Sequence, residues 1–125
     1  MASETGNVGI GTTQPAYKLD VLGTIRAQAV KINTSGVPDF VFDKDYNLRS
    51  LSEVEQYVKA NKHLPEIPSA KEMEQNGVSV SDMQNKLLQK VEELTLYVIE
   101  QEKTIKNLNS IVKLQQEEID SLKTK

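Results

Sequence analysis

Residues 87–122 read LLQKVEELTLYVIEQEKTIKNLNSIVKLQQEEIDSL and contain neither glycine nor proline. Every seventh residue is β-branched and apolar: Val91, Val98, Ile105, Val112 and Ile119. The complementary positions hold Leu87, Leu94, Leu108 and Leu122, with Gln101 and Gln115 in the two remaining places. This is the spacing of the a and d positions of a coiled coil. It predicts one long helix within residues 79–125, N-capped by Ser79, whose apolar stripe requires partner helices.

The residues in and beside this stripe bear on the number of helices. β-Branched residues at a with leucine at d favour two strands. Leu88 at position e and Tyr97 and Ile111 at position g, however, widen the stripe toward what a third helix would cover. Gln101 and Gln115 at d also fit where three amides meet around one axis. We therefore predict a parallel homotrimer, with a homodimer as the alternative.

The N-terminal third carries β-strand signals. Glycine-rich sequence begins at Gly6, and apolar residues then alternate with polar ones as far as Ile32. Phe40–Phe42 is a short apolar run that fits a final strand. We expect the apolar faces of three chains to meet at a threefold axis through a head interface formed by Tyr17, Leu19, Val21 and Ile25.

Residues 43–78, called the cap below, carry signals for two short helices. Ser50 with Glu53 and Ser69 with Glu72 form candidate capping boxes, and Pro65 ends the first helix near His63. The sequence thus predicts an elongated α+β chain in three parts: a β-rich head segment (1–42), a cap of small helices with too few apolar residues for its own core (43–78), and a coiled-coil helix (79–125).

Composition limits the function classes. The formal net charge is -3, which gives no basic face for nucleic acid. Only 38% of the residues are apolar, which is few for a compact monomer and favours burial between chains. The chain has no cysteine, no apolar run long enough to cross a bilayer, and no signal-peptide pattern at its start. We expect no nucleic-acid partner and no membrane insertion.

No group of residues forms a convincing catalytic, cofactor or metal site. His63 is the only histidine, and one histidine without cysteine makes a poor metal site. The pairs Glu92–Glu93 and Glu117–Glu118 are expected mainly on the solvated face of the coiled coil. The chain is therefore predicted not to be an enzyme and to need no cofactor.

Several strings, in their order and spacing, carry a resemblance to a known group of proteins. They are GNVGIGTTQPAYKLDV from Gly6, FVFD from Phe40, HLPEIPSA from His63 and LLQKVEELTLY from Leu87. From Gly6 to about Asn109, the chain resembles the shaft-to-tip segment near the C-termini of bacterial surface fibres and phage tail-fibre-like proteins, especially those of Bacteroidetes. The resemblance implies an extracellular, cell-surface or virion or injection-particle fibre, of which this chain is one part.

The layout is also similar to the intramolecular chaperone domains at the C-termini of phage tail spikes, which bring three β chains into register. Many of those domains then cleave themselves with a Ser-Asp pair followed by a lysine. Ser81–Asp82 is the only Ser-Asp pair here, and it lacks the Arg-Leu-Lys that should follow. We therefore do not expect self-cleavage.

Two functions follow as hypotheses. The first is a trimerisation and assembly module, resembling an intramolecular chaperone, at the C-terminal end of a tail-fibre-like or adhesin protein. The second is a tip that binds a cell-surface receptor or glycan and is made multivalent by the coiled coil. Clustering of Phe40, Tyr46 and Tyr57 on an open surface would favour the second.

The mass in solution tests the predicted association directly. A chain of 14.0 kDa should give about 42 kDa by light scattering as a homotrimer and about 28 kDa as a homodimer. A mass that stays at that of one chain at micromolar concentration would contradict both states.

Overall fold

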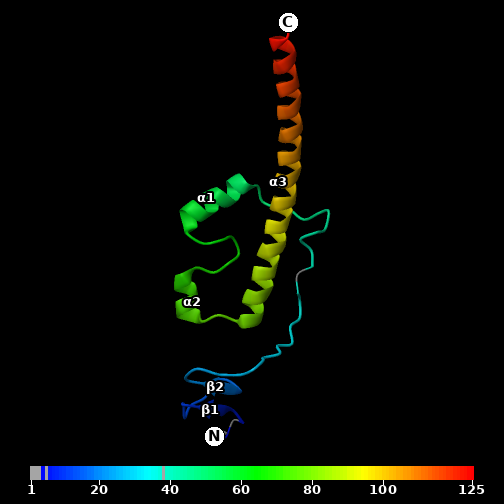
Figure 1. The fold of residues 1–125 in the computed structure, drawn as a ribbon. Helices are drawn as coiled ribbons and strands as arrows, with labels where there is room; N and C mark the ends of the chain where they lie inside the picture. Colours follow the sequence, from blue (N-terminus) through cyan, green and yellow to red (C-terminus); the bar gives the residue numbers. More distant parts are fainter. Residues whose placement is uncertain (1–3, 5, 38) are drawn as a thin grey trace. The chain divides into compact units, whose positions relative to one another are not determined.

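The computed structural model describes residue 4 and residues 6–37 and 39–125. It divides the chain into two units, Met1–Asn33 and Thr34–Lys125. Among the described residues, the first unit contains a two-stranded sheet and the second contains three helices, so the α+β content is as predicted (Figure 1).

The sheet of the first unit consists of β1 (Val8–Ile10) and β2 (Leu19–Val21), which pair in parallel with Val8 opposite Leu19. The Val8 amide donates to Lys18 O, and the Leu22 amide donates to Ile10 O. Gly11 follows β1 with φ +80°, and a Cβ there would lie 2.9 Å from Leu22 O. A glycine is therefore required where the chain leaves β1.

The prediction of strands beyond residue 21 was wrong. The described residues from 24 to 32 form no strand, and Phe40–Phe42 lies in a turn closed by the Asp43 amide donating to Phe40 O. Alternation of apolar residues marks a possible sheet face, but a strand also needs a neighbour for its backbone groups. In the described single chain, none is supplied to these residues.

Both cap helices begin at the predicted capping boxes. Helix α1 (Leu51–Asn61) has Ser50 as its N-cap, and α2 (Ala70–Asn76) has Ser69. In each, the serine hydroxyl accepts from the amide of the glutamate three residues later, whose carboxylate accepts from the serine amide. Helix α1 ends at Lys62 in the left-handed conformation, three residues before Pro65.

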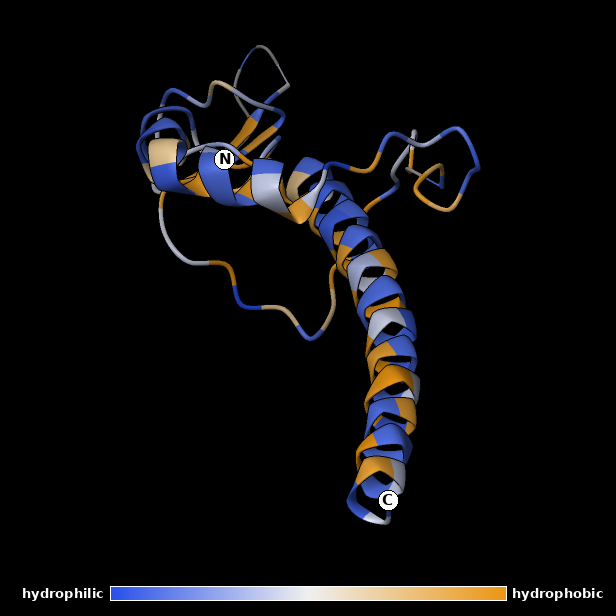
Figure 2. Ribbon diagram, turned by 90° about the horizontal axis from the view of Figure 1, so that it is seen from above, coloured by the Kyte–Doolittle hydropathy of each residue, from blue (hydrophilic) through white to orange (hydrophobic). Residues whose placement is uncertain are grey.

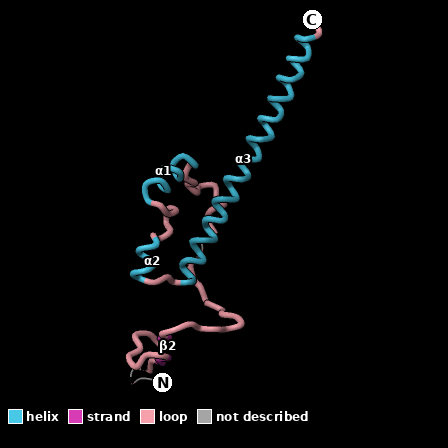
Figure 3. Tube along the Cα trace, turned by 60° about the vertical axis from the view of Figure 1, so that its left-hand side comes forward, coloured by secondary structure: helices cyan, strands magenta, loops and turns pink. Residues whose placement is uncertain are grey.

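Helix α3 (Val80–Lys123) has 44 residues, so it is about 66 Å long. Ser79 caps it and accepts from the Asp82 amide, as predicted. Figures 1 and 3 show α1 and α2 beside the N-terminal half of α3, with the C-terminal half extending past them. Among the described residues, no helix of the cap comes into close backbone contact with α3.

The single chain buries little apolar surface. Among the described residues, Val41 is the only fully buried apolar side chain, at 1% exposure. The accessible surface is 10830 Å², whereas a compact monomer of this mass would expose about 6,700 Å². None of the described helices is both long and apolar enough to cross a membrane.

Candidate self-association site

The predicted a and d positions form one uncovered stripe along α3, called the seam below. Its nine apolar members are between 46% and 69% exposed: Leu87, Val91, Leu94, Val98, Ile105, Leu108, Val112, Ile119 and Leu122. Gln101 and Gln115 are exposed with them. Apolar residues recur along the whole of α3 in Figure 2. The chain's own cap therefore does not cover the seam.

The cap meets α3 on a different face, through a cluster that joins distant parts of the chain. Tyr46 and Glu66 of the cap meet Gln89, Lys90 and Glu93 of α3, and these five residues are called the polar cluster below. Lys90 donates to Glu66 Oε2 at 2.5 Å and to Glu93 Oε2 at 2.9 Å. The Tyr46 hydroxyl donates to Glu93 Oε1, and Gln89 Nε2 lies 3.2 Å from the Tyr46 hydroxyl oxygen.

Lys90 and Glu93 are sheltered from solvent, whereas the Glu66 side chain is 45% exposed. Lys90 is 8% exposed, and the Glu93 side chain is 13% exposed. Arg49 lies 3.6 Å from Glu66 Oε1, so the two carboxylates are balanced by two cations. Buried charges paired in this way are costly to separate. The cluster therefore fixes where the loops on either side of α1 meet α3.

The pKa values in the cluster move in the directions expected of such pairing. For Glu93, burial acts to raise the pKa, but hydrogen bonds from Tyr46 and Lys90 outweigh it and the pKa is lowered. For Lys90, burial acts to lower the pKa, but its bonds to Glu66 and Glu93 outweigh it and the pKa is raised. Burial, followed by the bond to Glu93, raises the pKa of Tyr46. All three shifts favour a charged Lys90–Glu93 pair beside a neutral tyrosine.

Sequence reasoning missed this cluster. In the heptad numbering, Glu93 is at position c and Lys90 at position g, and Glu93 was expected to be solvated; that expectation was wrong. Tyr46 precedes Glu93 by 47 residues, and local spacing does not reveal such a pair. The signal available was a lysine and a glutamate three residues apart, which is common on exposed helices.

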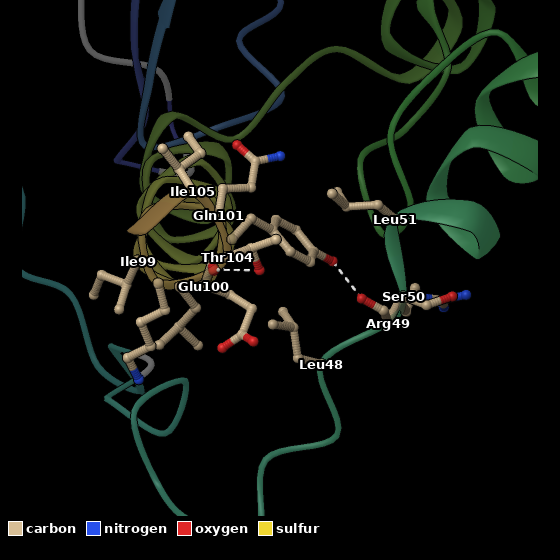
Figure 4. Close-up of a pocket in the computed structure, with 12 residues that line it drawn as sticks. Leu48, Arg49, Ser50, Leu51, Ile99, Glu100, Gln101, Thr104 and Ile105 are labelled. Carbon is tan, nitrogen blue, oxygen red and sulfur yellow. Dashed lines mark hydrogen bonds between the residues drawn. The ribbon is translucent and has the colours of Figure 1, made fainter. Parts of the chain in front are cut away.

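Tyr97 makes a contact that the sequence did not predict. Its hydroxyl donates to Arg49 O at 2.6 Å, a bond that links α3 to the residue before the N-cap of α1 (Figure 4). Burial raises its pKa. The hydroxyl is thus bonded within the chain, and a stripe widened by Leu88, Tyr97 and Ile111 stays a prediction.

The three aromatic residues named above do not form one open cluster. Phe40 packs against Tyr46 with ring centroids 5.7 Å apart, and Tyr46 belongs to the polar cluster. Tyr57 lies edge-on to His63 at 5.6 Å, with the Arg49 guanidinium 5.9 Å from its centroid. Each ring is occupied in a local contact.

Other candidate residues are placed as follows. His63 Nδ1 lies 2.9 Å from Leu64 O, and no group of three or more potential metal ligands occurs among the described residues. Ser81 Oγ lies 3.3 Å from Ser79 Oγ in the first turn of α3. In the first unit, Tyr17, Leu19 and Ile25 are exposed and Val21 is half-buried. Their meeting at a threefold axis stays a prediction.

Comparison of the chain with models of known protein families, with curated protein sequences and with solved structures finds no match. The function is therefore argued from the seam, the polar cluster and the resemblance of the sequence strings.

Removal of the Tyr46 hydroxyl should loosen the cap. Tyr46→Phe deprives Glu93 of one charge-assisted hydrogen bond, which should cost about 1–2 kcal/mol. Hydrogen exchange of the Ile67 amide, which donates to Leu64 O beside Glu66, should accelerate roughly 5- to 30-fold. Tyr57→Phe is the matched control and should leave that rate nearly unchanged. Equal rates in the two variants would contradict a fastening role for the cluster.

Acid should release the same contact. Because folding lowers the pKa of Glu93, its carboxylate stabilises the docked cap above the unfolded glutamate pKa of about 4.3, and this stabilisation is lost as the pH falls through the folded value. Lys90 has a raised pKa, so its contribution is lost only as the pH rises through that folded value, well into the alkaline range. The Ile67 protection factor should therefore drop below about pH 4. Glu93→Gln should start lower and vary less with acid; the same acid profile in both proteins would refute the assignment.

Proposed function

We propose that the chain is a trimerisation and assembly module at the C-terminal end of a fibre protein. The observation that carries the proposal is the seam: an apolar stripe along a 44-residue helix that the rest of the described chain leaves uncovered. Copies of the same helix in parallel register are the covering that a heptad repeat fits.

Magnitudes favour this association. Complete burial of a Val, Leu or Ile side chain contributes about 1.5–3 kcal/mol, and the nine apolar seam residues are about half exposed. Burying the rest should contribute about 1 kcal/mol each, or roughly 10 kcal/mol per chain before association costs. That is comparable with the stability of a whole small domain.

The number of chains is proposed as three, with two as the alternative. Gln101 and Gln115 at position d support three, because amides at a threefold axis can bond to one another. Leu88, Tyr97 and Ile111 beside the seam support the same state, because they widen the apolar stripe.

The assembly role rests on what association would do for the N-terminal unit. Three coiled-coil helices hold three N-terminal segments at high local concentration, which favours correct pairing of strands that are too short to be stable alone. The resemblance to fibre tips and to tail-spike chaperone domains supports this role and implies a place outside the cell. Phe40, Tyr46 and Tyr57 do not form one open cluster, so the observation that would have favoured the receptor- or glycan-binding alternative is not made.

Two charges in the seam should test the proposal. Ile105→Asp/Val112→Asp would place carboxylates where helices meet, so light scattering should show one chain and the β-sheet amides Val8 and Leu22 should lose protection.

Asn107→Asp/Ser110→Asp is the matched control. It adds the same two charges at positions c and f of the same stretch, away from the seam, and should keep the oligomeric mass. A seam variant with unchanged mass would refute self-association through α3, and a protected sheet in separated chains would refute the assembly role.

A further inference from the structure

The cap has an apolar edge that borders the seam. Leu51 and Leu64 are 47% and 43% exposed. Together with Leu94 at position d and Tyr97 at position g, they line a hollow of about 130 Å³. The cap therefore lies on the g side of the seam and in this hollow reaches it only at Leu94.

A second, open groove of about 790 Å³ runs on from this edge. Leu48 and Leu51 line it from the cap, and Gln101 and Ile105, both seam residues, line it from α3. Figure 4 shows Leu48 and Leu51 across this space from Gln101 and Thr104. A helix that covers the seam would therefore lie beside this groove at Gln101 and Ile105.

The chain's own helices do not fill it. Helix α1 buries none of its residues, and Leu51 at its start is half exposed. The polar cluster and the Tyr97–Arg49 bond hold the loops at the two ends of α1 against α3. The groove is thus held open by contacts that do not involve the seam.

In a parallel coiled coil, the g side of one helix lies against the e side of the next. The e positions of α3 level with the cap are Leu88, Thr95 and Glu102. Leu88 and Thr95 are uncharged and suit the apolar edge. The Glu102 carboxylate is opposite in charge to the guanidinium of Arg49, whose side chain is 48% exposed. The e side of a second copy therefore complements the cap edge in polarity and in charge.

We propose that the cap of each chain docks onto α3 of the neighbouring chain, with Leu51 and Leu64 against its e side near Thr95. The inference rests on the proposed coiled coil and adds a second interface to it. Each groove is complete only when a second chain is present, so the caps form a collar around the N-terminal half of the coiled coil. The collar favours one axial register, because a shift of one heptad in either direction would move Glu102 away from Arg49.

The absence of native cysteine allows a direct test by disulfide formation between chains. Full-length Leu51→Cys is refolded together with full-length Thr95→Cys or Glu102→Cys, one of the two chains carrying a mass tag. On a non-reducing denaturing gel, a mixed dimer should form with Leu51→Cys and at least one of the two e-side variants, since a disulfide requires Cα atoms within about 7 Å.

Two controls separate the possible failures. Gln56→Cys lies about 140° round α1 from Leu51 and should give at least tenfold less mixed dimer. Leu108→Cys, at a d position beyond the cap, should crosslink to itself and reports the coiled coil alone. Crosslinking at 108 without any from 51 would overturn the collar and leave the proposed function standing. Absence of both crosslinks would overturn the two together.

Discussion

The uncovered seam of α3 is the constraint on which the rest of this structure depends. A helix about 66 Å long carries apolar side chains at positions that its own chain does not reach, and water is a poor environment for them. The described chain has almost no interior of its own, with Val41 as its fully buried apolar residue. Burial within the described chain therefore contributes little hydrophobic stabilisation, and the proposed association would supply it between chains.

Helix α3 divides its circumference between two tasks. Positions a and d are uncovered in the described chain, whereas positions c, f and g contact the cap through Glu93, Gln89 and Lys90. Charged and hydrogen-bonding groups hold the cap, and apolar groups form the seam. This division would allow the cap to stay attached in the proposed coiled coil, because the polar cluster uses no side chain of the seam.

The hydrogen bonds and ion pairs of the polar cluster also explain how so small a cap keeps a defined position on α3. Its two helices bury no residue of their own, so hydrophobic burial within the cap is weak. The ion pairs of Lys90 with Glu66 and Glu93 instead fix the position of the cap along α3, because a charge-assisted hydrogen bond tolerates little displacement. The cost is sensitivity to protonation of Glu93.

The sequence by itself determined the helices and their ends. Ser50, Ser69 and Ser79 cap helices where expected, because capping depends on residues three apart, and the seam follows from a seven-residue period within one element. Tertiary structure alone decided that Tyr46 reaches Glu93, that Tyr97 binds Arg49, and that Phe40–Phe42 forms a turn and not a strand. These outcomes depend on which distant segments meet, and the residue types near each position are compatible with several answers. Helix caps and heptad periodicity depend on residues that are close together in the sequence. Strand pairing and buried ion pairs depend on a distant partner residue that the local sequence does not identify.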